Sequence, residues 1–289
     1  MNDLLTAAAA GLAGAGAYAL LGVCTVFTYR LVAVVNFTGA AIGAAGAFVF
    51  VTLTEAGAPL LPSAVAGLAF GALLGVAIGF VMTRWFAGAN ASTKAAVTVA
   101  LLVGIVAIGL RLTGGQHTHS FPDLVPGAAF RLAGVEVTNA AIATLALALL
   151  FTVAADLFLA RTRAGLHLRA LSERPMAAEL IGVPVRRLSL FVWGVTGAAT
   201  TLALMIVAPQ RAPDFMSLSL LVVPALAAAL IGFFNSFWAA LIGGAALGVA
   251  ESLTSAFPAL SEYRAGAPFL VILAVLLWSQ RGARWDDAR

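Results

Sequence analysis

The sequence predicts an all-α integral membrane protein, a polytopic bundle of eight or nine transmembrane or partly re-entrant helices. Hydrophobic residues make up 62% of the 289 residues and charged residues only 10%, and the mean hydropathy is +1.04. Soluble domains keep far more charge on their surface. The apolar residues also fall into long runs that short polar stretches separate. We therefore expect a single transmembrane domain over residues 1–289.

Nine apolar runs account for most of the chain. In order they cover residues 5–27, 33–54, 62–83, 95–110, 138–160, 188–208, 217–232, 236–254 and 267–279. A helix needs about 20 residues to cross about 30 Å of hydrocarbon. Most runs reach this length, but 95–110, 217–232 and 267–279 are short, and we expect the short ones to be tilted, broken or re-entrant. The first run lacks a basic segment before it and is expected to be a retained helix.

The second run begins with polar residues and continues with spaced glycines. Asn36 and Thr38 would be costly facing lipid, so we expect them to face protein or a water-filled cavity. Small residues then recur at spacings of four and three along one helical face, at Gly39, Gly43 and Gly46. Such a face permits either close helix packing or a helix that lines a solute path.

Basic residues predict the orientation. If loop 161–187 is cytoplasmic, twelve of the sixteen Lys and Arg residues lie on that side and four on the other. Basic residues favour the cytoplasmic side. Nine crossings then place the C-terminus in the cytoplasm and the N-terminus outside, although a re-entrant segment would reverse the side of the N-terminus.

The stretch 111–137 becomes the largest external loop. Its Pro, Gly and small residues predict compact irregular structure with room for a short strand, facing an extracytoplasmic partner. His117 and His119 lie two apart, a spacing that can bind metal in an extended segment. Two histidines alone are too few for a site, so we expect no metal.

Polar residues also interrupt the later runs. Asn235 and Ser236 lie in the "GFFNS" break, and Glu251 lies within the run that follows. For Glu251 two interpretations stay open: an ion pair or interfacial position, and a role in gating or in the pathway. The same run repeats the small-residue pattern at Gly243, Gly244 and Gly248.

The longest charged stretch is "RALSERPMAAELIGVPVRRL" at 169–188. Residues 173–182 predict a short helix, with Pro175 in its first turn and Gly182 ending it. Its apolar surface and arginine rim suit the groove of a soluble partner or the surface of an anionic membrane, and both interpretations stay open.

Motifs for catalysis are missing from the sequence. It contains no GxxxxGK[ST] phosphate loop, HExxH, CxxC or GxSxG motif, and its single cysteine, Cys24, excludes a disulfide within the chain. We therefore expect no enzyme, no catalytic residue and no cofactor bound by this chain. Because the basic residues lie near the ends of the runs, they indicate topology and not a nucleic-acid partner.

Three regions carry a resemblance to a known family. "MAAELIG" at 176–182 resembles the EAA loop of ATP-binding-cassette importer permeases, in which two small residues, three further residues and a glycine form a coupling helix. Its context at 168–198, together with "AYALLGVCTVFTYRLVAVVNF" at 17–37 and "LIGFFNSFWAALIGGAALGVAESL" at 230–253, is similar to the branched-chain amino-acid (LivH/LivM) permeases. The order and spacing agree, and the chain is identified as a LivH-like member.

The resemblance implies a permease subunit of an importer for branched-chain amino acids or a similar small polar organic solute. It implies separate ATPase subunits that bind ATP and Mg²⁺, a second permease subunit, identical or related, an extracytoplasmic solute-binding protein and surrounding lipid. The expected location is the bacterial or archaeal cytoplasmic membrane. The coupling helix would comprise Arg174, Met176, Ala177, Ala178, Glu179, Ile181 and Gly182. The pathway candidates are Asn36, Phe37, Thr38, Asn235, Ser236 and Glu251.

The main alternative is a secondary transporter or passive channel without an ATPase. Glycine-rich helices and a short broken helix pair also occur in such folds. The apolar helix predicted in loop 161–187 and the scarcity of intramembrane ionisable groups for ion coupling favour the importer.

Overall fold

A computed structural model describes residues 2–115, 119–132, 135–173, 184–210, 214–254, 257 and 266–280. Its helices are α1 (Asn2–Val32), α2 (Gly39–Glu55), α3 (Leu60–Trp85), α4 (Ala91–Leu112), α5 (Asn139–Arg161), α6 (Arg163–Glu173), α8 (Val185–Val207), α9 (Phe215–Ser219), α10 (Val222–Ile231), α11 (Phe237–Thr254) and α13 (Ala267–Gln280). A 3₁₀ turn covers Ala208–Gln210, and two strands, β1 (Ala128–Leu132) and β2 (Val135–Thr138), complete the described elements.

The predicted all-α membrane fold is confirmed, and each of the nine apolar runs corresponds to a helix or to a helix pair. Six stretches of the described chain are long and apolar enough to cross a membrane: Gly14–Val32, Leu60–Trp85, Ala91–Leu112, Asn139–Arg161, Val185–Gln210 and Phe237–Thr254. The shorter apolar helical stretches are Gly39–Glu55, Phe215–Ile231 and Ala267–Trp278. The run at 95–110 is thus part of a helix of full spanning length.

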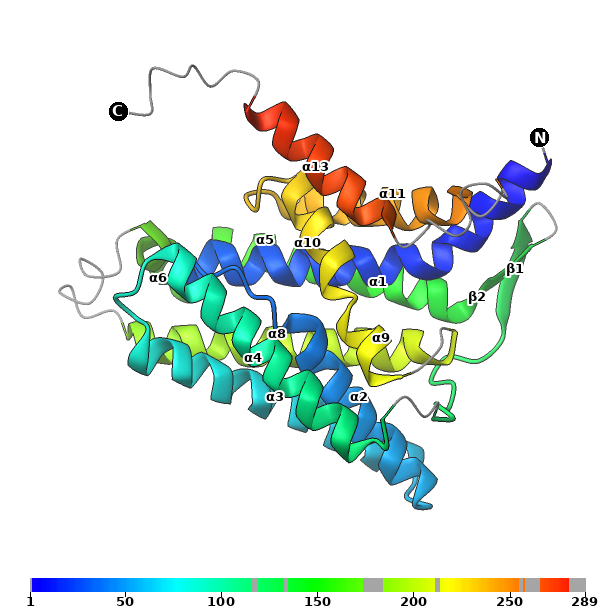
Figure 1. Cartoon of the computed structure of the whole chain (residues 1–289), viewed down its shortest axis with the longest axis horizontal. Helices are drawn as coiled ribbons and strands as arrows, with labels where there is room; N and C mark the ends of the chain where they lie inside the picture. The colour runs from blue at the N-terminus through cyan, green and yellow to red at the C-terminus, as the bar shows by residue number, and fades with distance from the viewer. Residues whose placement is uncertain are drawn as a thin grey trace.

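The long helices lie roughly along one axis of the bundle (Figure 1). At one end lie α6 and the turn between α3 and α4, which we call the α6 end. At the opposite end lie β1 and β2, which pair as an antiparallel hairpin and confirm the predicted strand (Figure 1). We call this the hairpin end. Between these ends, α1 runs through the centre with α5, α8, α10 and α11 packed around it.

Large apolar side chains cover the outer helices. More than half of each of the following side chains is exposed: Leu61, Leu73, Val103, Ile108, Leu270 and Leu277. They come from α3, α4 and α13. A soluble protein would leave little such surface in water, whereas lipid tails solvate it without cost. The surface therefore fits a multi-pass membrane protein.

Glycines allow the helix backbones to approach closely. On α3, a Cβ at Gly71 or Gly75 would overlap α8, at the Thr201 hydroxyl and the Trp193 carbonyl respectively. On α11, a Cβ at Gly248 would come within 2.6 Å of the Ala15 backbone in α1. Without side chains at these points, van der Waals packing between backbones can hold the bundle together in lipid.

Two helices begin near the middle of the bundle. After α1, Ala33 adopts a left-handed conformation with φ of 52°, and the chain turns back toward the bundle centre before α2 starts (Figure 1). Between α9 and α10 the helix is interrupted at Leu220 and Leu221, so α10 also starts inside. The broken geometry expected for 217–232 is therefore observed, and a similar break, which hydropathy did not reveal, precedes α2.

Candidate functional site

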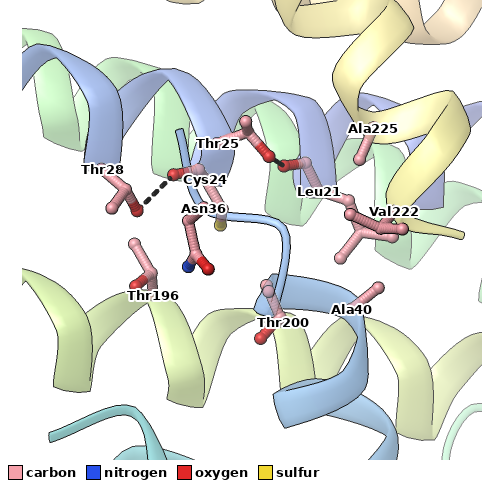
Figure 2. Close-up of a pocket in the computed structure, with 11 residues that line it drawn as sticks. Leu21, Cys24, Thr25, Thr28, Asn36, Ala40, Thr196, Thr200, Val222 and Ala225 are labelled. Carbon is pink, nitrogen blue, oxygen red and sulfur yellow. Dashed lines mark hydrogen bonds between the residues drawn. The ribbon is translucent and has the colours of Figure 1, made fainter. Parts of the chain in front are cut away.

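A small cavity lies where these two helix starts meet α1 and α8 (Figure 2). Its walls come from four parts of the chain: Leu21, Cys24, Thr25 and Thr28 of α1; Asn36, Gly39 and Ala40 at the start of α2; Thr196 and Thr200 of α8; and Val222 and Ala225 of α10. The volume open to the centre of a water molecule is about 10 Å³, close to the least that one water needs. The structure is therefore closed around this point.

Four buried threonines give the cavity a polar lining. The hydroxyls of Thr25 and Thr28 donate to the carbonyl oxygens of the preceding turn of α1, at 2.8 and 3.0 Å. Thr196 and Thr200 do the same in α8, at 2.9 and 3.1 Å. Because each hydroxyl proton points back at its own helix, the oxygen keeps its acceptor capacity for a group in the cavity. The lining residues include no Asp, Glu, Lys, Arg or His.

Asn36 shapes the start of α2. Its Oδ1 accepts the backbone N–H of Thr38 at 2.9 Å and the Thr38 hydroxyl at 2.6 Å. Since a backbone N–H can only donate, the atom that it contacts is the oxygen of the amide. The other atom of the amide, Nδ2, therefore takes no part in these two hydrogen bonds. In Figure 2 the Asn36 side chain points into the space between α1 and α8. Asn36 itself is only 4% exposed.

The glycines of α2 have two roles: some lie at close contacts with neighbouring helices, and one lines the cavity. A Cβ at Gly43 would come within 2.8 Å of the Thr200 backbone, and one at Gly46 within 2.8 Å of the Gly67 carbonyl, so both hold α2 against its neighbours. A Cβ at Gly39 would meet only Asn36 Nδ2 at 3.7 Å. Gly39 thus lies at the cavity, where it leaves the backbone open.

Comparison with known proteins decides the family. Residues 7–276 match the family described as "Branched-chain amino acid transport system / permease component". The chain belongs to this family.

A curated relative agrees with this assignment, and a solved structure is also similar to the chain. The permease is 25% identical over 243 residues to the "Probable branched-chain amino acid transport permease protein LivH" of Methanocaldococcus jannaschii, which covers 81% of this chain and 76% of the relative. A solved structure described as "PsaBC from Streptococcus pneumoniae in complex with Fab" covers 95% of this chain and 91% of its own, with a TM-score of 0.48 and 16% identity. The family match and the LivH relative confirm the resemblance to LivH-like ATP-binding-cassette permeases, and the permease is of the transport-subunit type.

The pathway candidates named from the sequence fall in three places of the permease. Asn36 lines the central cavity. Thr38 does not line it but is hydrogen-bonded to Asn36, and Phe37 packs on the core. Asn235 and Ser236 lie instead in the turn between α10 and α11, where Asn235 is exposed. There the Ser236 hydroxyl accepts the N–H of Ala239 at 3.1 Å. The structure therefore separates these two residues from Asn36.

Glu251 occupies a third place. Its Oε2 accepts a hydrogen bond from the Tyr18 hydroxyl, across the contact between α11 and α1. Both line a pocket of about 230 Å³ that Ser217, Pro224 and Phe269 also border. Tyr18 lies one turn along α1 from Leu21, which lines the central cavity. Within the described residues no ion pair involves Glu251, and the contact of its carboxylate there is the hydrogen bond from Tyr18.

The predicted coupling helix, Arg174 to Gly182, lies outside the described residues. Its flanks are described: α6 ends at Glu173 and α8 begins at Val185. At this α6 end, cationic groups lie over aromatic rings, with the Arg186 guanidinium 4.7 Å from the Phe80 ring and that of Arg30 4.8 Å from Phe237. Such contacts fix helix ends at a polar boundary.

Sequence reasoning missed the four threonines of the cavity. A threonine in an apolar helix can satisfy its own hydroxyl, as these do, and carries no signal by itself. The available signal was spacing: Thr25 and Thr28 lie three apart in α1, and Thr196 and Thr200 lie four apart in α8, so each pair shares a face. Only the packing of α1 against α8 shows that the two faces meet.

Proposed function

We propose that this chain is the membrane-spanning subunit of an importer that moves branched-chain amino acids, or a similar small polar organic solute, into the cytoplasm. ATP hydrolysis takes place in separate ATPase subunits. The observation that carries this proposal is an uncharged polar cavity at two interrupted helices, in the middle of a bundle whose family is that of branched-chain amino acid permeases. A polar solute can cross there without facing lipid.

The closed cavity supports alternating access. Because its free volume is about 10 Å³, a solute larger than water enters only after α8 or α10 moves away from α1. Contacts through small residues, such as Gly22 of α1 against Ala228 of α10, permit such sliding. ATP binding and hydrolysis in the partner subunits would supply the energy for this movement.

We place the α6 end in the cytoplasm. Arg30, Arg84 and Lys94 lie at helix ends there, as do the arginines of α6 and the start of α8 (Figure 1). The described arginines at the hairpin end are Arg111 and Arg131. The same placement puts the C-terminus in the cytoplasm and the hairpin outside, where it would receive solute from a binding protein.

The coupling role of the 174–182 segment is tested by Gly182→Trp. A helix can dock closely in the groove of a partner only where its contact side chains are small. A tryptophan at position 182 should therefore abolish solute-stimulated ATP hydrolysis while membrane insertion stays normal. The measurement is ATPase activity of the complex purified from its native membrane in mild detergent, with its companions identified by mass spectrometry.

Gly88→Trp is the matched control for this variant. Gly88 lies in the turn between α3 and α4 at the same α6 end, and a Cβ there would meet nothing within 4 Å. We expect it to keep normal coupling. If Gly182→Trp also transports normally, the coupling assignment fails. If the chain purifies without an ATPase, the alternative of a channel or secondary transporter replaces the importer.

A further inference from the structure

Hydrogen-bond donors gather on one side of the central cavity. As the first residues of α2, Gly39, Ala40 and Ala41 have N–H groups with no partner inside the helix. Within the described part of the chain, no other group accepts a hydrogen bond from them. Gly39 and Ala40 line the cavity. The peptide dipoles of the 17-residue α2 also place a partial positive charge, roughly half a unit, at this end.

The Asn36 amide adds an independent donor at the same point. Its oxygen is already used by Thr38, and no described residue accepts from its Nδ2 group. The side chain is 4% exposed and is directed into the cavity (Figure 2). The Nδ2 atom is not sealed off by the protein, since every fully buried side-chain nitrogen or oxygen of the described residues has a hydrogen-bond partner. Nδ2 therefore stays accessible from the cavity as a free donor to a water or to a solute that accepts hydrogen bonds.

Acceptors line the neighbouring walls. The oxygens of Thr25, Thr28, Thr196 and Thr200 keep lone pairs free because their protons point at helix carbonyls. All four side chains are at least nine-tenths buried. With no charged side chain in the lining, neither a net anion nor a net cation would find a counter-ion there, and desolvation would exclude both.

We infer that α2 and Asn36 form the carboxylate subsite of the transport path, and that the threonine hydroxyls of α1 and α8 receive the ammonium group of the same zwitterionic solute. This inference rests on the proposed transport function and assigns its binding residues. Helix N-termini favour anionic groups, and the amide Nδ2 can donate to the second carboxylate oxygen. Binding without an ionic side chain is weak, as a path that must also release its solute requires.

Asn36→Asp tests the subsite. Aspartate keeps an oxygen for the Thr38 N–H but replaces the donor with a second carboxylate oxygen, which repels a solute carboxylate. The readout is the amount of L-[¹⁴C]leucine taken up per ATP hydrolysed by the complete complex in proteoliposomes, at saturating binding protein. We expect this ratio to fall by about tenfold or more. The same binding protein serves both forms, so the difference belongs to the permease.

Asn90→Asp is the matched control. Asn90 also precedes a helix and accepts a backbone N–H with its Oδ1, that of Thr93 at 2.8 Å, but it lies far from the cavity at the α6 end. The ratio should stay at the wild-type value. A second variant, Asn36→Thr, keeps an oxygen for Thr38 and removes the amide donor without adding charge, and it should lower the ratio less than Asn36→Asp does.

The outcomes separate the subsite from the transport function. An unchanged ratio in both Asn36 variants overturns the subsite. A parallel loss of uptake and ATP hydrolysis, which leaves the ratio unchanged, also overturns it and makes Asn36 a folding residue. A complex that imports a neutral amide such as isovaleramide but no amino acid overturns the subsite and leaves the importer intact. Failure of the importer itself would show as the lack of a co-purifying ATPase.

Discussion

His119 connects the loop that follows α4 to the C-terminal end of α2 through hydrogen bonds. Its Nδ1 lies 2.9 Å from the Glu55 carboxylate and its Nε2 lies 3.2 Å from the Thr113 carbonyl oxygen, so both ring nitrogens face acceptors. Burial lowers the pKa of His119, but the hydrogen bonds to Glu55 and Thr113 and the charge of Glu55 outweigh it, so the pKa lies above its ordinary 6.5. The protonated form of the ring is therefore favoured, because both of its nitrogens then donate to these acceptors.

The stability contributed by His119 should depend on pH. A raised pKa in the folded state means that the contribution is complete below the unfolded value of 6.5 and is lost as pH rises through the folded value. We expect His119→Gln to lower the melting temperature by about 2 °C at about pH 5.5 and by less at about pH 8.5. Thermal denaturation of both forms in detergent measures this difference, and a pH-independent difference would contradict the assignment.

The contact between α3 and α8 depends on glycine over several turns. Gly67, Gly71, Gly75 and Gly79 recur every four residues on α3 and face α8 or its neighbour α2. Gly75→Leu would force its Cβ into the Trp193 carbonyl, which is backbone and cannot rotate away. We expect a loss of about 1–3 kcal/mol or more, as for overpacked cores. Melting temperature and the yield of monodisperse protein measure it.

Gly104→Leu makes the same chemical change elsewhere. Gly104 lies in the middle of α4, where a Cβ would meet nothing within 4 Å and the side chain would face lipid. This variant should keep the wild-type melting temperature. An equal loss in both variants would mean that the loss at Gly75 does not come from the contact between α3 and α8, since leucine favours a helix more than glycine does.

Hydropathy predicted which segments are helical better than where they begin. The run at 33–54 starts with apolar residues, yet α2 begins only at Gly39, because the Asn36 side chain takes the Thr38 N–H and ends the extended segment there. Conversely, α4 starts at Ala91, before the apolar run, because Asn90 caps polar residues into a first turn. Local hydrogen bonds set both starts, and apolar content does not report them.

The site was predictable only in part for a related reason. A polar residue in an apolar run can lie at an internal break or in a surface turn, and both occur here. Asn36 and Thr38 lie at an internal break between helices, whereas Asn235 and Ser236 lie in a turn at the end of the bundle. Their sequences look alike, since each pair adjoins phenylalanine and a helix start. Only the long-range packing of α1 on α8 tells them apart.

The orientation of the whole molecule can be tested with its own chemistry. Cys24 is the single cysteine of the chain and is buried, so an introduced surface thiol reports its own position. We expect Asp123→Cys, near the hairpin end, to react with a membrane-impermeant maleimide in intact spheroplasts. Gly88→Cys, in the turn between α3 and α4, should react only after the membrane is opened.

The reverse labelling pattern would mean that the chain has the opposite orientation in the membrane. The proposed cytoplasmic position of loop 161–187 would then be wrong. Labelling of both sites in intact spheroplasts would show that the two ends do not lie on opposite sides. The wild-type chain, with only Cys24, supplies the background in each case.

The uncharged lining of the central cavity also determines how transport responds to voltage. A unit charge that crosses a membrane at 100 mV gains or loses about 2.3 kcal/mol. The cavity walls carry no acidic or basic side chain, and a zwitterion carries no net charge. Neither opening of the cavity nor passage of such a solute would then move charge across the membrane. Import would proceed at the same rate in energised and in depolarised cells, as long as ATP is supplied.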